Sequence, residues 1–347
     1  MTTALTLYSD QLEIPLDDEE RIFDDIATAR PVHAKSHGLL KADLQVSANL
    51  PAHLRQGLFA TRTSYPAIMR FSTNPGDMLP DSISTPRGLA VKVLGVTGKM
   101  LENHEGQSTQ DFVFVNGKVF PNRNASEFLQ QLKFMEKHIT DSQALKQIVS
   151  TTARLAEEAL EVVGSESAAL LGFGHPEKHI LGETFSSVAP LRYGQYVAKI
   201  AFQPASESLK ELTGKKLENM SDFSALRDAV VRFFETESAV WDVQVQLMAD
   251  PAKMPIEDAS VQWSEEDSPY VTVGHLTAAP QAAYSPERRV FVNEMLAFNP
   301  WHSLEAHRPL GNVMRTRKKA YLMASTFRAR MNSRPIVEPR SIDELPA

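Results

Sequence analysis

The chain has 347 residues, of which 42% are hydrophobic and 23% charged, which is an ordinary globular composition. Its net charge of −7 gives no sign of the Lys and Arg excess that contact with phosphates requires, so we expect no nucleic-acid partner. The absence of cysteine excludes disulfides, zinc–thiolate sites, iron–sulfur clusters and thiol catalysis.

The N-terminal residues 1–28 look like an acidic arm. They lack the basic start and apolar run of a secretory signal. No stretch approaches the roughly 20 consecutive apolar residues of a membrane-spanning helix. We therefore expect a cytoplasmic protein without a membrane span.

In the first half of the chain the sequence pattern changes once, from strand-type to helix-type. Short β-type runs broken by Pro and Gly, at 67–72, 89–94 and 112–115, indicate an antiparallel sheet or barrel. Residues 125–165 then show apolar side chains at near-helical spacing, with Glu and Lys between them. This pattern predicts two amphipathic helices, to which we assign a packing role.

The second half returns to strands and ends in a helix. The patterns predict strands at 196–202, 240–247 and 270–273, a strand starting at 289–291, and helices at about 223–236 and 310–332. Sheet, helical insert, sheet and terminal helix fit one α+β unit. We expect a single domain over residues 29–335, followed by a C-terminal tail at 336–347.

The terminal helix carries the first candidate for chemistry. Arg317, Tyr321 and Arg328 are spaced by four and seven residues, which places them on one helical face. Positive charge beside a phenol favours the phenolate, which is a strong ligand for ferric iron. From this stretch alone, a basic surface helix with a half-buried tyrosine stays open.

A second candidate is His33, in the segment ARPVHAKSHG. His33 and His37 could chelate a metal if the segment were helical, but Pro31 and the Gly and Ser residues argue against a helix. A satisfied polar histidine is the plain alternative.

The strand at 67–72 carries a third. Arg70 and Ser72 alternate with Phe71 and therefore share one face of the predicted strand. A serine hydroxyl on that face could orient an imidazole by hydrogen bonding.

Together and in this order, these segments resemble the haem-dependent catalases, and in particular the short catalase-related peroxidases. RPVHAK is similar to the segment with the distal histidine, MRFST to its supporting strand, and RKKAY to the proximal tyrosine helix. PRGLAVKV, DFVFVNGKVFPNRNASEF, SPYVTVGHLT and VFVNEMLAFNPW are similar to further barrel and distal segments. The similarity spans about residues 20–330.

The resemblance implies an antiparallel β-barrel with flanking helices, beside which haem b is buried. It makes Tyr321 the iron ligand, Arg317 the residue that keeps it ionised, His33 the distal acid–base group and Ser72 its hydrogen-bonding partner. The remaining haem contacts implied are an apolar residue over the iron, three propionate-binding arginines and a distal aromatic: Val32, Arg30, Arg70, Arg328 and Phe128.

Two departures from the family pattern bear on activity. Large catalases have a paired Asn-Asn sequence on the distal side, where this chain has Val115-Asn116. Asn116 is therefore the asparagine expected to serve as the distal catalytic residue. The chain also ends soon after the tyrosine helix, and the resulting wider pocket favours bulkier organic or lipid peroxides.

The resemblance implies a peroxide-consuming oxidoreductase, a peroxidase or weak catalase that acts on hydrogen peroxide or organic hydroperoxides. Two alternatives stay open. One is a fatty-acid hydroperoxide isomerase, against which Val32 counts, because isomerase relatives carry a hydroxyl residue there. The other is a non-catalytic haem-binding protein. The family also implies a homo-oligomer, and NADPH binding is left open.

Overall fold

The computed structural model describes residues 30, 32–60, 64–74, 76, 78–83, 85–130, 133, 178–217 and 222–347. The expected N-terminal arm and most of the expected helical insert lie outside these residues. Residues 125–130 are helical, as the sequence pattern predicts.

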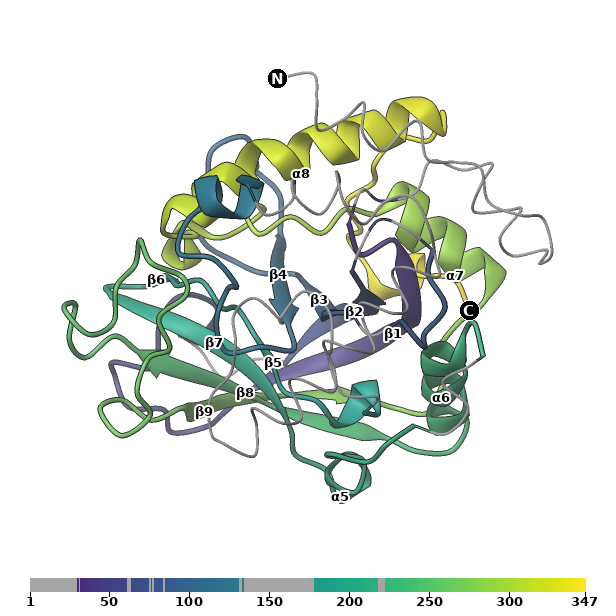
Figure 1. Cartoon of the computed structure of the whole chain (residues 1–347), viewed down its shortest axis with the longest axis horizontal. Coiled ribbons are helices and arrows are strands. Elements are labelled where there is room, and N and C mark those ends of the chain that lie inside the picture. The colour runs from purple at the N-terminus through teal and green to yellow at the C-terminus, as the bar shows by residue number, and fades with distance from the viewer. Residues whose placement is uncertain are drawn as a thin grey trace.

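The described residues form one antiparallel sheet. Its strands are β1 (Lys35–Val46), β2 (Ser64–Thr73), β3 (Arg87–Leu94), β4 (Thr109–Val115), β5 (Phe185–Ser186), β6 (Leu191–Tyr193), β7 (Tyr196–Pro204), β8 (Ala239–Leu247) and β9 (Val271–Ala278). Their order is β5-β4-β3-β2-β1-β9-β8-β7-β6, and β5 also pairs with β7 (Figure 1). This extra pairing closes eight strands into a barrel, with β6 attached to β7 alone. The predicted antiparallel barrel is confirmed.

Strands β2, β3 and β4 present two different faces. Phe71, Leu89 and Phe114 lie opposite one another in register and are buried in the large cluster that fills the barrel. The next positions, Ser72, Gly88 and Val115, are also in register and face outward, because side chains alternate along a strand. The outward positions of these three strands therefore hold the polar candidates.

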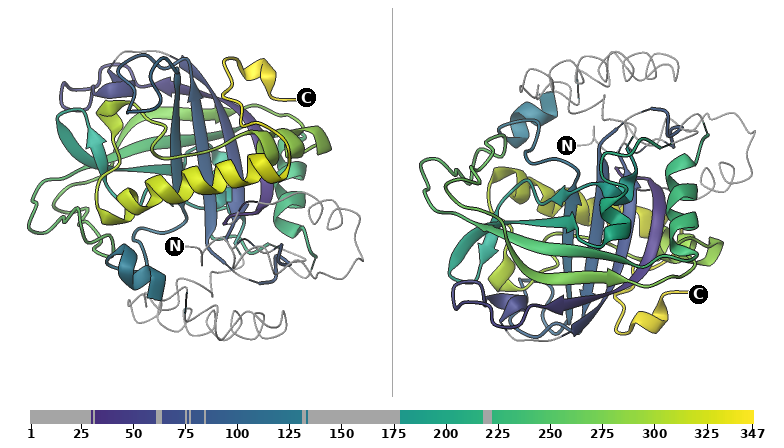
Figure 2. Two further views of the ribbon diagram at one scale, coloured as in Figure 1. Left: turned by 90° about the horizontal axis from the view of Figure 1, so that it is seen from above. Right: turned by 90° about the horizontal axis from the view of Figure 1, so that it is seen from below.

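The described helices lie outside the barrel. They are α5 (Glu207–Lys210), α6 (Ala225–Phe234), α7 (Pro286–Val290) and α8 (Asn312–Met331), with 3₁₀ turns η1 (Gly57–Phe59), η2 (Ile180–Gly182), η4 (Glu305–His307) and η5 (Ile342–Glu344). Figure 2 shows α8 crossing the outer side of β2, β3 and β4. The predicted helices at about 223–236 and 310–332 are confirmed as α6 and α8. No described helix has the length and apolarity needed to cross a membrane.

The strand predicted to start at 289–291 is wrong, because this stretch is helical. Ser285 accepts a hydrogen bond from the Arg288 amide at 3.1 Å, and Pro286 occupies the first turn, so α7 begins with two strong start signals. A π-type turn, η3 (Phe291–Met295), continues it directly. The strand was predicted from the apolar residues Val290 and Phe291.

The C-terminal tail lies against the outside of the barrel. Leu345 is 1% exposed and belongs to an outer apolar cluster with Ile68, Ala90 and Leu296. Val337 forms a parallel bridge with Leu296. The tail and η3 therefore lie side by side on the same outer side of the barrel.

Candidate functional site

His33 lies two residues before β1, on the outer face of β2 and β3. Its Nδ1 lies 3.3 Å from Ser72 Oγ. Its φ of 53° is in the left-handed region, which histidine adopts more readily than most residues. A Cβ atom added to Gly88 would lie 2.7 Å from the His33 ring, so only glycine leaves room for the ring there. The predicted pairing of Ser72 with His33 is thus present in the geometry.

The imidazole of His33 is held in its neutral form. Burial, together with the positive charges of Arg70, Arg317 and Arg30, lowers its pKa to about 3. At neutral pH one ring nitrogen therefore keeps a free lone pair. When Nδ1 carries the hydrogen and donates to Ser72 Oγ, that lone pair is on Nε2. The arrangement suits a proton acceptor.

Arg70 fixes the backbone around His33. Its Nη2 donates to the His33 carbonyl at 2.5 Å and its Nε donates to Ser36 Oγ at 2.9 Å. Arg70 is 3% exposed, and burial lowers its pKa to about 9. Arg70 and Ser72 share the outer face of β2, as the alternation predicts.

Two further arginines converge on one carbonyl. The Nη2 atoms of Arg30 and Arg328 donate to the Leu296 carbonyl at 2.6 and 2.9 Å. Burial lowers the pKa of Arg30 well below its usual value, and Arg328 and Arg70 lower it further. Burial also lowers the pKa of Arg328, to about 10. The three arginines form one cluster of like charge.

This arginine cluster is suited to an anion. Arg30 Nε is buried and finds no hydrogen-bond partner among the described residues. Like charges held together in a buried place raise the free energy of the folded chain unless a negative group neutralises them. Carboxylates that accept from the guanidinium groups would supply both the missing bond and the charge.

The tyrosine of α8 is paired with an arginine. Arg317 Nη2 donates to Tyr321 Oη at 2.6 Å, and its other Nη approaches Met314 Sδ at 3.2 Å. The α8 sequence is rich in Ala, Met, Arg and Lys, which favour helix, so the four-residue spacing brings the two side chains together. Tyr321 is half-buried.

The barrel side and the α8 side belong to one site. Arg317 on α8 contributes to the lowered pKa of His33, after burial and Arg70. Burial lowers the pKa of Arg30 and of Arg70, and Tyr321 acts on both in the opposite direction. The charges of these groups act on one another because the groups surround a common region between α8 and the barrel.

The structure does not bring Asn116 to His33. Its Oδ1 accepts from the Arg87 amide at 2.8 Å, and its Nδ2 donates to Glu183 at 3.1 Å. Val115, the neighbouring residue, pairs with Gly88 and therefore shares the outward face on which His33 lies. The Asn116 side chain thus bonds to the Arg87 amide and to Glu183.

Two more expected residues lie at the edge of the described part. Val32 is 42% exposed. Phe128 is half-buried, with its ring 4.9 Å from that of Phe120 in an edge-on contact. Both are available to an apolar ligand.

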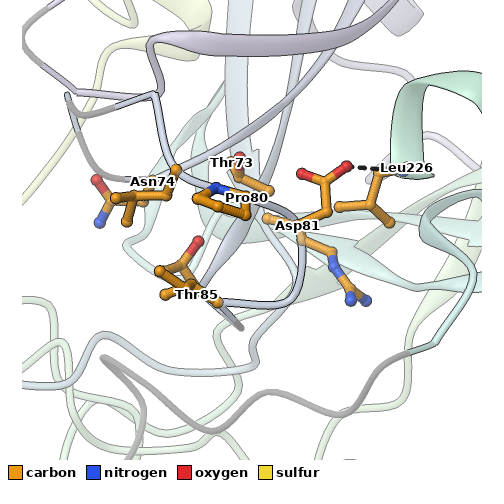
Figure 3. Close-up of a pocket in the computed structure, with 9 residues that line it drawn as sticks. Thr73, Asn74, Pro80, Asp81, Thr85 and Leu226 are labelled. Carbon is orange, nitrogen blue, oxygen red and sulfur yellow. Dashed lines mark hydrogen bonds between the residues drawn. The ribbon is translucent and has the colours of Figure 1, made fainter. Parts of the chain in front are cut away.

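A small polar pocket lies beyond the end of β2, next to α6 (Figure 3). Asp81 there accepts from the Leu226 amide at 2.8 Å and forms an ion pair of 2.8 Å with Lys35. Arg87 pairs with Glu183 at 2.7 Å. None of the site residues predicted from the sequence lines this pocket, and its charged groups already have partners. The lining is Thr73, Asn74, Leu79, Pro80, Asp81, Ile83, Thr85, Arg87 and Leu226.

Comparison with known proteins decides the family. The catalase family model matches residues 14–340. The chain belongs to the catalase family. Structures similar to this one include a bacterial catalase, with a TM-score of 0.62 and 18% identity over 96% of this chain and 66% of that one. Comparison with curated proteins found no match.

Two fungal structures have the same degree of similarity. A fungal catalase has a TM-score of 0.62 and 16% identity, over 97% of this chain and 71% of that one. Catalase A from Saccharomyces cerevisiae has a TM-score of 0.62 and 16% identity, over 96% of this chain and 72% of that one. At these identities the similarity shows the fold. The chain spans about two thirds of the length of these catalases.

Catalases typically bind haem, and the residues present here fit it. The three buried arginines, with Arg30 Nε unpartnered among the described residues, match a group that carries two carboxylates. A half-buried tyrosine bonded to Arg317 matches a phenolate ligand for ferric iron. The exposed Val32 matches a flat apolar surface that covers it.

Gly88 is the site residue that sequence reasoning missed. The run PRGLAVKV marks a strand, and glycine in a strand interior often signals a close approach. That signal was present, but it did not say which group approaches. The neighbour, His33, is 55 residues earlier in the chain.

Proposed function

We propose that this chain binds haem b through Tyr321 and consumes peroxides, as a peroxidase or weak catalase. The observation that carries the proposal is one region bounded by a neutral histidine on the barrel and by an arginine-bonded tyrosine on α8. The arginines between them match the carboxylates of haem. Hydrogen peroxide and organic hydroperoxides are the proposed substrates.

The distal side of the site handles protons. Haem, when bound, supplies the iron at which the oxygen–oxygen bond of a peroxide is cleaved. His33 Nε2 would take the proton from one oxygen of the peroxide and return it to the other, so that water or an alcohol could leave. Ser72 Oγ orients the ring through Nδ1, and Gly88 leaves the ring its space.

The α8 side would supply the iron ligand, Tyr321. Arg317 holds Tyr321 Oη beside a fixed positive charge at 2.6 Å. A phenolate donates electron density to ferric iron, and the arginine moderates that donation. Met314 Sδ accepts from the same guanidinium and limits its rotation.

The outward face of β4 favours a peroxidase over an efficient catalase. Rapid disproportionation needs a second peroxide to be oriented beside the histidine, and an amide donor assists this. Val115, opposite Gly88, offers no hydrogen-bonding group there. The proposed enzyme therefore relies on an organic reductant more than on a second peroxide.

The absorption spectrum of the haem-loaded protein tests the iron ligand. We expect a high-spin ferric haem spectrum in the parent, lost or strongly shifted in Tyr321→Phe. Tyr196→Phe is the matched control, because Tyr196 lies on β7 and is 40% exposed. A parent protein that refuses haem, or an unchanged spectrum in Tyr321→Phe, would overturn the proposal.

Measurements of turnover distinguish an enzyme from a protein that only binds haem. Oxygen release and reductant oxidation are measured with hydrogen peroxide and with an alkyl hydroperoxide. We expect reductant oxidation to exceed oxygen release, and His33→Ala to lose about 100-fold or more of the turnover. Equal activity in His33→Ala would mean that the chain binds haem without using this site.

A further inference from the structure

A buried lysine outside the site is paired with two carboxylates. Lys92 Nζ lies 2.7 Å from Asp111 Oδ1 and 2.5 Å from Glu338 Oε1, and the lysine side chain is fully buried. Asp111 alone would balance its charge. The second carboxylate, on the 22% exposed side chain of Glu338, comes from the C-terminal segment.

Glu338 brings the C-terminal segment against the barrel. Thr109 Oγ1 also donates to Glu338 Oε1, at 2.6 Å, so both β3 and β4 hold this carboxylate. One residue earlier, the Val337 amide donates to the Met295 carbonyl at 2.9 Å. Arg334 Nε lies 2.7 Å from Glu294 Oε2. Residues 334–338, which we call the C-terminal clasp, thus contact the end of η3 at successive points.

The end of η3 also holds two arginines of the site. Arg30 and Arg328 both donate to the Leu296 carbonyl, and Leu296 is the residue that bridges to Val337. A π-type turn is intrinsically less stable than an α-helical one and benefits from outside support. The clasp lies on one side of residues 294–296 and the arginines lie on the other.

We propose that the C-terminal clasp positions the arginine cluster of the site, with Glu338 as its positioning residue. Glu338 contacts Lys92 and Thr109, which are outside the arginine cluster. It anchors the clasp to Lys92, the clasp fixes the Leu296 carbonyl, and that carbonyl orients Arg30 and Arg328 toward the carboxylates of haem. The inference rests on the proposed haem function.

The electrostatic and the positioning effects of Glu338→Gln would change the affinity for haem in opposite directions. The variant removes a negative charge beside Lys92, and the Lys92 ammonium and the Arg30 guanidinium each lie 5.9 Å from the centre of the Phe298 ring. Through charge alone, the arginine cluster would then bind an anion more tightly. Through positioning, the two guanidinium groups lose their fixed direction and bind haem more weakly. The sign of the change in affinity therefore decides between the two.

The experiment titrates haem into folded apo-protein and follows the absorption band. We expect affinity to fall about 10-fold in Glu338→Gln, the scale typical of outer partners of metal-site groups. Val337→Pro, which removes the amide donor without changing charge, should lower it similarly. Glu207→Gln, an 85% exposed carboxylate on α5, is the charge-matched control and should leave it unchanged. Equal or tighter haem binding in Glu338→Gln overturns the proposal.

Hydrogen exchange in the haem-free protein gives a second readout. We expect faster exchange across residues 291–297 in Glu338→Gln and Val337→Pro, with no change in α6 or in Glu207→Gln. Unchanged exchange at 291–297 would overturn the clasp whatever the haem titration shows. A parent that fails to bind haem would overturn the proposed function instead, and the exchange experiment would still decide the clasp.

Discussion

The two faces of β2, β3 and β4 differ in chemistry, although alternate residues of the same three strands form them. The inward row of Phe71, Leu89 and Phe114 is apolar and joins the barrel core. The outward row of Ser72, Gly88 and Val115 borders His33. A barrel that is filled with side chains has no interior room for a large cofactor. The outside of the barrel, covered by α8, is therefore where this fold can build a site.

The comparison of faces also applies to histidines. The ring of His307, from η4, packs among the core rings of Phe59, Phe112 and Tyr193, and burial lowers its pKa to about 4. His33 lies outside, with a pKa of about 3. Among the core rings, neutrality serves stability alone. On the outer face, the proposed function gives neutrality a second role, in proton transfer.

Acid should produce the largest effect. His307 and His179 both have a pKa of about 4 in the folded chain, lowered first by burial, against an ordinary value of 6.5. The unfolded chain binds these protons first, so stability falls as pH drops below about 6.5 and continues to fall towards pH 4. Urea unfolding at pH 7 and pH 5 should show a loss of several kcal/mol.

Total activity should follow the fraction of protein that stays folded as the pH falls. Because His33 stays neutral down to a pKa of about 3, turnover per folded molecule should not show a separate titration near 6.5. A loss of turnover near pH 6.5 in protein that is still folded would contradict the lowered pKa of His33. It would also separate His33 from His307.

Gly88→Ala should have the next largest effect, on activity. The new methyl group would lie 2.7 Å from the His33 ring, and the ring must move by a fraction of an ångström or more. A displacement of about 1 Å can cost about 100-fold in rate, which is the loss expected in kcat/KM for peroxide. Gly117→Ala is the control, because its nearest contact is an ordinary 3.7 Å. Full activity in Gly88→Ala would mean that the close contact between residue 88 and the His33 ring does not matter for turnover.

Local spacing predicted antiparallel strands, α6, α8 and the arginine–tyrosine pair, whereas the closed barrel was implied by the resemblance to catalases. Arg317 and Tyr321 are four residues apart on a helix, and Arg70 and Ser72 are two apart on a strand. Alternation along β4 also could have placed Val115 on the outward face, opposite Gly88. The resemblance drew attention to the only nearby asparagine instead.

Contacts between distant segments could not be predicted. The convergence of Arg30 and Arg328 on Leu296 depends on how η3 lies against α8. The clasp depends on Glu338 reaching Lys92, 246 residues earlier. The strand expected at 289–291 failed because the Ser285 cap and Pro286 outweigh a short apolar run.

Asn116→Leu should affect stability rather than activity. The substitution leaves the Arg87 amide and Glu183 without the part-buried hydrogen bonds that Asn116 provides. Leaving buried polar groups unpaired costs about 1–3 kcal/mol, to be measured by urea unfolding. Turnover per folded molecule should stay near the parent value. A large loss of turnover with unchanged stability would return Asn116 to the catalytic side.

Val115→Asn should have the smallest effect, and it changes the outward face alone. It places an amide opposite Gly88, on the side of β4 where His33 lies. An amide donor there can orient a second peroxide, so oxygen release from hydrogen peroxide should rise about 10-fold while reductant oxidation changes less. Val113→Asn, one outward position further along β4 and opposite Ala90, is the control. Because both variants add the same group to the same strand face, a rise confined to Val115→Asn would mean that nearness to His33 limits disproportionation. No rise in either would mean that the limit lies elsewhere than in the missing amide.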